Sequence, residues 1–214
     1  MHPGYKKILK FFKNKKILIT GNTGFKGAWL TIFLSKFDCK LYGYSNGIVT
    51  KPSLYKILLL EKKINTYFKD IKDPKNLKKV IYNIKPDIIF HLAAQSLVPE
   101  SIKNPKDTIL TNSIGTFNLL EILRNYKKKI ACVIITSDKC YYPKKNKSYF
   151  SENDHLGGED PYSASKACAE IIYKSFQETY LNKKKNLRTC TVRAGNVVGG
   201  GDWSGNRIIT DIFN

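Results

Sequence analysis

Short runs of apolar and β-branched residues alternate along the chain with longer segments whose apolar positions recur at helical spacing. The apolar runs predict strands over Lys16–Thr20, Lys40–Tyr44, Asn65–Lys69, Asp87–His91, Ile130–Thr136 and Leu187–Arg193. The intervening segments predict helices over Gly24–Lys36, Pro52–Leu60, Pro74–Asn83, Pro105–Arg124 and Pro161–Tyr180. Several of these helices begin with proline, which is favoured at the first helical position.

This alternation of strand and helix is typical of βαβ units, which build parallel sheets. The strand segments are continuous apolar runs rather than alternating ones, as burial under helices on both faces of a sheet requires. The sequence therefore predicts an α/β fold with a doubly wound parallel sheet. After Arg193 the pattern changes to a glycine-dense stretch, followed by a short apolar segment over 208–213.

The number and distribution of charged residues indicate which kinds of binding partner to expect. The chain has 37 Lys+Arg and 17 Asp+Glu among 214 residues, a formal net charge of +20. Few of the basic residues are arginines, and the lysines fall in short runs at expected helix ends and loops. A nucleic-acid-binding protein would gather basic and aromatic side chains on one face. We therefore expect no nucleic-acid partner, although the positive charge favours anionic substrates.

The apolar runs and the cysteines indicate a reduced, cytoplasmic protein. No apolar run approaches the ~20 residues that cross a bilayer. Lysines interrupt the apolar residues of Tyr5–Lys16, which is unlike a signal peptide, so we expect no membrane partner. The five cysteines include no C-x-x-C pair, so neither a zinc site nor a disulfide framework is indicated and no metal is expected.

A glycine-rich loop follows the first predicted strand and opens the first predicted helix, with the spacing G-x-x-G-x-x-G. Gly21 permits a tight turn, Gly24 lets the backbone approach a pyrophosphate, and Gly27 lets the helix lie close to the sheet. Free N–H groups of the first helical turn would face the anion. A ligand-free strand-to-helix turn would also use glycine, but the buried strand before it and the helix after it favour a Rossmann-type dinucleotide site.

A tyrosine and a lysine stand four residues apart in Tyr162-Ser163-Ala164-Ser165-Lys166, hence on one face of a helix. An ammonium group near Tyr162 would lower the pKa of the phenol, which could then take a proton from a substrate hydroxyl. An exposed Tyr/Lys pair without a function is the common alternative for this spacing alone.

A polar cluster, Thr136-Ser137-Asp138-Lys139, ends the fifth predicted strand, where open α/β sheets bind ligands. The Ser137 hydroxyl can hold a substrate oxygen, Asp138 can protonate a leaving group, and Lys139 can act as a base if it is neutral. A simple turn with aspartate as its cap is the alternative.

These motifs occur in one chain order with two others, His91-Leu92-Ala93-Ala94-Gln95 and Thr111-Asn112. The sequence resembles the extended short-chain dehydrogenase/reductases, the NAD-dependent epimerase/dehydratase family. The resemblance runs from about Lys16 to Asp211. In stretches such as T-S-D-K-C-Y and R-A-G-N-V-V-G-G-G-D-W it is similar to the members that dehydrate CDP-glucose.

The resemblance implies NAD as cofactor and a nucleotide sugar as substrate. Residues expected to contact NAD are Gly21, Thr23, Gly24, Phe25, Lys26, Gly27, Asp70, Ile71, Leu92, Ala93, Ala94, Thr111, Tyr162 and Lys166. Those expected near the substrate are Gln95, Asn196 and Arg207, the last as a phosphate partner. The second strand is followed by neither an acidic nor a basic residue, so NAD rather than NADP rests on the resemblance.

The implied reaction removes water from a nucleotide-linked hexose, most closely CDP-glucose, and gives a 4-keto-6-deoxy sugar. Tyr162, assisted by Lys166, would take the 4-hydroxyl proton while Ser137 holds the 4-oxygen. Asp138 would protonate the departing 6-hydroxyl. Lys139 stands where related dehydratases have a glutamate base, so it would act at C5 either as a base or as an electrostatic stabiliser.

The family also implies a domain division and an oligomer. We expect an NAD-binding domain over 1–194 and, over 195–214, the start of a smaller substrate-binding region of which most is missing. A homodimer through the helices Pro105–Arg124 and Pro161–Tyr180 is expected. The alternative functions are a sugar-nucleotide epimerase or reductase, which would not need Asp138 and Lys139, and an inactive NAD-binding fragment.

Overall fold

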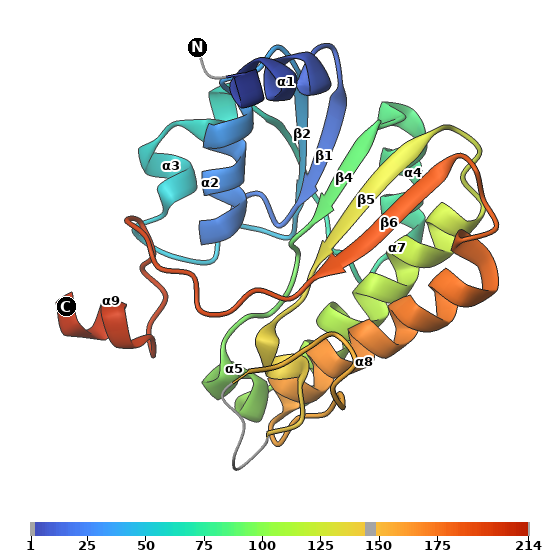
Figure 1. Ribbon diagram of the computed structural model, residues 1–214. Coiled ribbons are helices and arrows are strands. Elements are labelled where there is room, and N and C mark those ends of the chain that lie inside the picture. The colour runs from blue at the N-terminus through green and yellow to red at the C-terminus, as the bar shows by residue number, and fades with distance from the viewer. Residues whose placement is uncertain (1–2, 144–148, 214) are drawn as a thin grey trace.

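The computed structural model describes residues 3–143 and 149–213. At its centre is a six-stranded sheet of order β3-β2-β1-β4-β5-β6 in which all neighbours pair in parallel (Figure 1). The strands are β1 (Lys16–Thr20), β2 (Lys40–Ser45), β3 (Asn65–Phe68), β4 (Ile88–His91), β5 (Ile130–Ile135) and β6 (Leu187–Val192). Each lies within a residue of its predicted bounds, and the order confirms the doubly wound, Rossmann-type fold.

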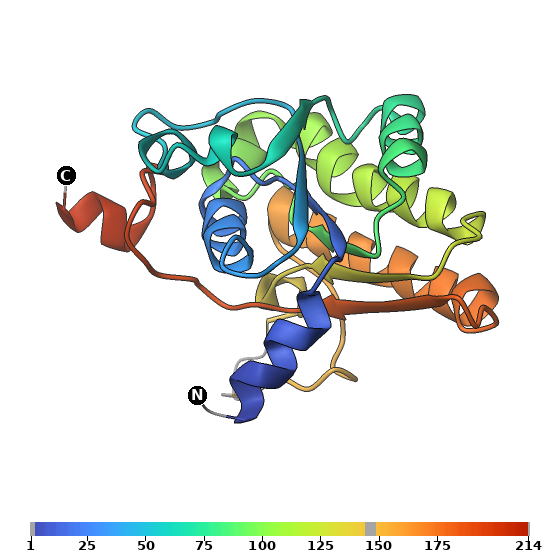
Figure 2. The same ribbon diagram turned by 90° about the horizontal axis from the view of Figure 1, so that it is seen from above.

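The helices form a layer on each side of the sheet (Figures 1 and 2). One layer contains α1 (Pro3–Phe12), α2 (Phe25–Leu34) and α3 (Leu54–Ile57). The other contains α4 (Pro74–Ile84), α7 (Gly115–Arg124) and α8 (Pro161–Phe176). Short helices α5 (Val98–Lys103) and α6 (Pro105–Ile109) precede α7, and α9 (Ile208–Phe213) lies apart from the sheet near the C-terminus.

Alternate residues of the central strands fill two hydrophobic layers. Leu18 belongs to the layer beneath α4, α7 and α8, whereas its neighbours Ile17 and Ile19 belong to the layer beneath α2 and α3. All three are fully buried. Burial on both faces explains why these strands are continuous apolar runs.

Strand β6 departs from that prediction because helices cover only one of its faces. Leu187 is buried, whereas Arg188, Cys190 and Val192, which alternate along the other face, are exposed. β6 is an edge strand, and α7 and α8 lie on the same side of the sheet (Figure 2).

Two predicted helices are interrupted. The segment predicted as Pro52–Leu60 forms only α3 and a 3-10 turn over Leu60–Lys62, because Leu59 between them has a left-handed backbone with φ of 49°. The segment predicted as Pro105–Arg124 contains a π-helical turn, Leu110–Ile114, between α6 and α7. Helix α8 likewise continues into a π-helical turn, Gln177–Leu181.

Helices α1 and α5 were not predicted. Lysines interrupt the apolar residues of α1, yet Leu9 and Phe12 pack against the hydrophobic layer beneath α2. Tertiary packing therefore stabilises a helix whose sequence alone showed only scattered apolar residues.

The segment after β6 crosses the carboxyl edge of the sheet and packs against the first helical layer. The indole N–H of Trp29 on α2 donates to the carbonyl of Gly200 at 3.0 Å. A Cβ on Gly201, where φ is 84°, would lie 2.6 Å from the side chain of Leu54. Trp203 then packs on the same hydrophobic layer as α2. The glycines thus allow this segment to lie close to α2 and α3.

Candidate active site

The glycine-rich loop lies where β1 meets α2, and two of its glycines are required by the fold. Gly21 has φ of 71°, and a Cβ there would lie 2.8 Å from the backbone nitrogen of Ala93. A Cβ on Gly27 would lie 2.1 Å from the carbonyl oxygen of Gly21. Gly24 differs, because a Cβ there would meet only that same oxygen at 3.5 Å, an ordinary contact. Protein packing therefore does not explain Gly24, and the open space there would let a ligand approach the backbone.

Helix α2 also has an open amino terminus. Gly24 is its N-cap and supplies no side-chain hydrogen bond, whereas Asp73 caps α4 and Asp160 caps α8. The first N–H groups of α2 are therefore not satisfied by a capping side chain, and the helix dipole favours an anion there. This donor set fits the pyrophosphate of a dinucleotide.

Other residues expected around the cofactor hold the loop itself. The Thr23 hydroxyl lies 2.6 Å from the Ser45 hydroxyl and donates to the carbonyl of Gly47, also at 2.6 Å. Ile71 is buried in the core, and Asp70 is half-exposed and paired with Lys72. The remaining cofactor residues, Phe25, Leu92, Ala94 and Thr111, are partly buried near the carboxyl ends of β1 and β4 or on the π turn.

A chain of hydrogen bonds fixes the carboxyl ends of β1 and β4. The N–H of Ala93 donates to the Thr20 hydroxyl, which lies 2.8 Å from Nδ1 of His91. Nε2 of His91 lies 3.3 Å from the hydroxyl of Thr116, which donates to the carbonyl of Asn112. Burial lowers the pKa of His91 to about 3, so the ring is neutral and can link a donor to an acceptor.

Tyr162 and Lys166 lie on the sheet-facing side of α8, and both are buried. The Lys166 ammonium donates to the backbone carbonyl of Ile135 at 3.4 Å. Burial, followed by the charge of Lys26, lowers the pKa of Lys166 to about 8. Lys26 comes from the first turn of α2, so the start of that helix and Lys166 share one electrostatic environment.

The pKa of Tyr162 corrects a prediction. Burial raises it, while the hydrogen bond with Ser137 and the charge of Arg207 lower it by less. The sequence predicted a phenol whose pKa is lowered by Lys166. In the structure Lys166 instead bonds to the strand β5, and desolvation decides the direction.

The Ser137–Lys139 turn stands at the end of β5, opposite α8. Ser137 is buried and donates to Oδ1 of Asp138 at 3.1 Å, and it accepts from the N–H of Lys139 at 3.2 Å. Asp138 and Lys139 are both exposed. The alternative of a turn with an aspartate cap is wrong in one detail, since Ser137 is the N-cap of the 3-10 turn. Ser137 and Asp138 both act on the phenol of Tyr162, and Lys139 follows them on the exposed side of the turn.

The structure adds Asn112, which the sequence analysis noted without assigning a role. Its side chain accepts from the Gln95 N–H at 2.8 Å and donates to the Gln95 carbonyl at 2.9 Å. It also donates to the hydroxyl of Ser165, which lies between Tyr162 and Lys166 in the sequence, at 2.8 Å. Nothing in the sequence singles it out for this role, because Asn112 stands in a run that also contains Thr108, Thr111, Ser113 and Thr116.

The three expected substrate residues have different surroundings. The Gln95 amide donates to Leu97 and Thr108 and accepts from Leu97, so its polar atoms are used within the protein. Asn196 is exposed. Arg207 bridges Oδ2 of Asp202 at 2.9 Å and Oγ of Ser96 at 3.3 Å.

Arg207 nevertheless lies in the same cluster as the catalytic candidates. Its positive charge lowers the pKa of Tyr162. It also lowers the pKa of Lys26, where burial is the larger cause and the negative charges of Asp138 and Asp202 oppose the change. The segment after β6 therefore brings a cation to the carboxyl edge of the sheet.

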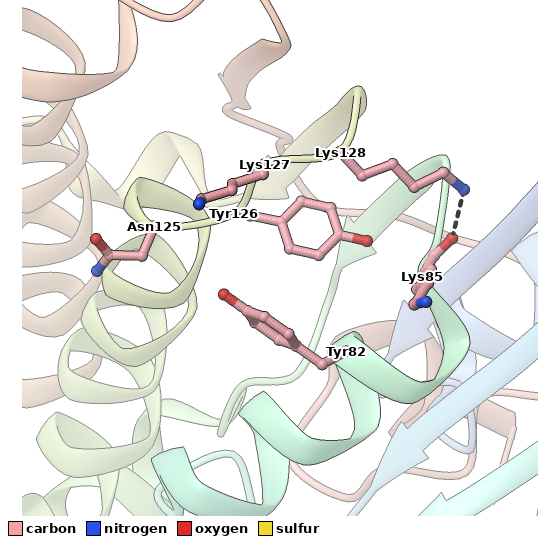
Figure 3. A pocket seen from close by; sticks show the side chains of 6 residues that line it. All are labelled: Tyr82, Lys85, Asn125, Tyr126, Lys127 and Lys128. Atoms are coloured by element: carbon pink, nitrogen blue, oxygen red, sulfur yellow. Dashed lines mark hydrogen bonds between the residues drawn. The ribbon is translucent and has the colours of Figure 1, made fainter.

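A separate surface pocket lies at the opposite, amino ends of β4 and β5 (Figure 3). Tyr82 and Tyr126 meet edge to face in it, with ring centroids 5.5 Å apart. The residues that line it are Tyr82, Lys85, Asn125, Tyr126, Lys127 and Lys128. Lys128 donates to the carbonyl of Lys85 at 2.9 Å, and none of these residues was predicted to act in the reaction.

Neither a metal-binding cluster nor a membrane-spanning helix is found among the described residues. Among residues 3–143 and 149–213, no cluster of histidine, cysteine, aspartate and glutamate is suited to hold a metal ion. Within the same ranges, none of the helices is both long enough and apolar enough to pass through a membrane.

Comparison with known proteins agrees with this geometry. Residues 18–201 match the family model described as GDP-mannose 4,6 dehydratase. The chain is 41% identical over 207 residues to CDP-glucose 4,6-dehydratase of Salmonella typhimurium, a match that covers 95% of this chain and 58% of that protein.

Solved structures show the same fold. The epimerase Mth375 of Methanothermobacter thermautotrophicus matches with a TM-score of 0.82 and 26% identity, over 99% of this chain and 62% of that one. A dTDP-glucose 4,6-dehydratase of Bacillus anthracis, in complex with NAD, matches with a TM-score of 0.75 and 25% identity, over 92% of this chain and 60% of that one. The chain thus spans less than two thirds of the length of each of these relatives. It belongs to the GDP-mannose 4,6 dehydratase family, and so to the extended short-chain dehydrogenase/reductases.

Proposed function

We propose that this chain carries the NAD-binding and catalytic part of a sugar-nucleotide 4,6-dehydratase, with CDP-glucose as the substrate. One observation carries the proposal: Tyr162 and Lys166 on α8 face the Ser137–Lys139 turn at the same sheet edge as the uncapped start of α2. The 41% identity to a CDP-glucose 4,6-dehydratase supports the choice of substrate.

The cradle at the start of α2 fits NAD, which supplies an acceptor and later a donor of hydride when bound. The open N–H groups of α2 would hold its pyrophosphate, and the clear space at Gly24 would let the backbone approach it. Lys26 and Lys166 add positive charge on the same side of the loop.

Tyr162 takes the proton of the sugar 4-hydroxyl, and Ser137, its hydrogen-bond partner, orients the 4-oxygen. Because burial raises the pKa of this phenol, the Lys166 ammonium must favour the phenolate when substrate is present. The neighbouring turn then supplies a second acid–base pair. Asp138 gives a proton to the departing 6-hydroxyl, and Lys139 withdraws the proton from C5 or stabilises the negative charge that forms there.

Replacing Lys139 by alanine is expected to abolish loss of water, while oxidation of the sugar at C4 is retained. We expect dehydration to fall by about 10²- to 10⁴-fold, the usual contribution of an acid–base group. Reduction of NAD, followed by absorbance after mixing with CDP-glucose, should persist. Lys103→Ala, at an exposed lysine on α5, is the control. Wild-type dehydration by the Lys139 variant would refute both roles of this residue.

The outer faces of α7 and α8 support the proposal of a homodimer. Phe117 on α7 and Ile171 on α8 are exposed apolar residues, as is Ile114 of the π-helical turn before α7. Phe117 contacts Phe176 of α8 with ring centroids 5.5 Å apart. Such a patch is typical of an interface.

Ile171→Asp is therefore expected to weaken self-association roughly tenfold or more, since a charge would enter the buried interface. Analytical ultracentrifugation measures this change. Ile57→Asp, at an equally exposed isoleucine on the opposite helical layer, is the matched control. A wild-type chain that is monomeric at all concentrations tested would exclude the dimer.

The function is tested by incubating this chain with NAD and CDP-glucose, beside dTDP-glucose and GDP-mannose, and following each sugar nucleotide by mass. Loss of one water from CDP-glucose alone is the expected result. A change of configuration at C4 with no loss of mass would favour an epimerase. If the chain binds NAD but forms no product, the proposed cofactor site stands and catalysis by this chain alone is refuted.

A further inference from the structure

A buried carboxylate lies one turn beyond Lys166, on the face of α8 that carries Lys166. Glu170 is 3% exposed and takes no part in the proposed reaction. Its Oε1 accepts from the hydroxyl of Thr136, and its Oε2 accepts from the hydroxyl of Thr191 at 3.1 Å and from the guanidinium of Arg193 at 2.9 Å. One side chain thereby joins α8 to the carboxyl ends of both β5 and β6.

Arg193 extends this network beyond the catalytic turn. Its second nitrogen donates to the Tyr141 hydroxyl at 2.9 Å and to the Glu152 carbonyl at 3.2 Å. The guanidinium also lies 4.9 Å from the centre of the Tyr141 ring, which stacks on Phe150. Arg193 is thus bonded on one side to Glu170 and on the other to the segment that follows the turn.

These contacts hold the catalytic turn at both ends. Thr136 immediately precedes Ser137, and Tyr141 immediately follows Cys140, the last residue of the 3-10 turn. Both therefore connect to Glu170, directly or through Arg193. Because Lys166 lies four residues before Glu170 on one helix face, the network fixes the turn relative to the Tyr162/Lys166 pair.

We propose that Glu170 is a positioning residue, which locks the Ser137–Lys139 turn to the helix carrying Tyr162 and Lys166 and places a buried negative charge one helical turn from Lys166. The inference rests on the proposed function for its kinetic consequence only. The contacts and the charge are properties of the chain itself.

The charge around Lys166 agrees with this role. Burial and Lys26 lower the pKa of Lys166, and Glu170 and then Cys140 oppose them. His91 of β4 is also within electrostatic range but is neutral. Removing the negative charge of Glu170 would take away the larger of the two contributions that oppose burial and Lys26, so Lys166 would lose its proton at lower pH.

Glu170→Gln tests the charge. We expect turnover of CDP-glucose at pH 8 to fall by about 10- to 100-fold, as for small displacements of catalytic groups, with little change in KM. The alkaline limb of the kcat profile, where the Lys166 ammonium is lost, should move to lower pH. Glu170→Asp should restore part of both effects. Glu178→Gln, at an exposed glutamate beyond the end of α8, is the control and should behave as wild type.

Thr136→Val tests positioning with the charge retained. It removes the hydroxyl that bonds to Glu170 but keeps the shape of the side chain and the backbone bond to Val192. We expect a lower kcat with an unmoved alkaline limb. Amide hydrogen exchange of Asp138 and Lys139 should be roughly tenfold faster, because opening of the turn no longer breaks this contact.

Two measurements need no turnover and so separate this inference from the proposed function. Lysine side-chain NMR, with Lys166 assigned from Lys166→Met, gives its titration in wild type and in Glu170→Gln. Hydrogen exchange reports the turn. An unchanged Lys166 titration overturns the electrostatic role, and unchanged exchange in Thr136→Val overturns positioning. If Glu170→Gln does not fold, Arg193→Lys, which keeps one cation beside Glu170, is measured in its place. The proposal is refuted if both Arg193→Lys and Thr136→Val have the wild-type kcat and the wild-type exchange rate in the turn.

Discussion

Tyr162→Phe is expected to abolish dehydration while the chain still folds and binds NAD. The substitution removes only the hydroxyl that bonds to Ser137 at the carboxyl end of β5. A positioned acid–base group contributes about 10²- to 10⁴-fold to rate, so turnover of CDP-glucose should fall by that factor. Mass analysis of the sugar nucleotide measures the loss. Calorimetric titration should give an NAD affinity within a few-fold of wild type.

Tyr173→Phe is the matched control for this experiment. Tyr173 is a second buried tyrosine on α8, but its hydroxyl lies 3.3 Å from Thr189 and away from the Ser137 turn. Its removal should leave turnover unchanged. Equal losses in the two variants would mean that the phenol of Tyr162 supports the helix rather than the chemistry.

Gly27→Ala and Gly24→Ala are expected to fail in different ways, although they lie one helical turn apart. The Cβ that Gly27→Ala adds would lie 2.1 Å from a backbone oxygen and 2.7 Å from the Cα of Asn22, so α2 must move away from the sheet. We expect the free energy of unfolding to fall by about 3 kcal/mol, the upper range for overpacking. For a chain of this size Tm should fall by about 6–12 °C.

Gly24→Ala should leave Tm nearly unchanged, because its Cβ meets the protein only at 3.5 Å. The new methyl group would instead occupy the space through which a pyrophosphate approaches the start of α2. We expect NAD affinity to fall by roughly tenfold or more, about 1.4 kcal/mol. Thermal unfolding with and without NAD measures both effects, and a Gly24 variant that binds NAD as wild type does would remove the reason for placing the cofactor there.

Much of the fold could be predicted because its signals are local. Each central strand is apolar on both faces, so strands such as Lys16–Thr20 were recognised within a residue of their ends. The glycine-rich loop and the four-residue spacing of Tyr162 and Lys166 are likewise contained in a few consecutive residues. A parallel sheet brings the carboxyl ends of its strands to one edge, which is why motifs far apart in the sequence were expected to meet there.

The predictions that failed depended on distant partners. The helix expected from Pro52 ends at Ile57 because Leu59 has a left-handed backbone. Strand β6 is buried on one face only, because neighbouring segments decide which positions are covered. The Gln95 amide, which we expect near the substrate, bonds within the protein to Leu97 and Thr108. No pattern along the chain reveals such a choice of partner.

The sequence by itself determined the α/β class, the strands, the glycine cradle and the identity of the groups that meet at the sheet edge. Only the tertiary structure decided that burial raises the pKa of Tyr162, and that Glu170 and Arg193 link the catalytic turn to α8. The physical reason is that backbone preference and hydrophobic period act over a few residues, whereas desolvation and hydrogen-bond pairing depend on what folding brings alongside.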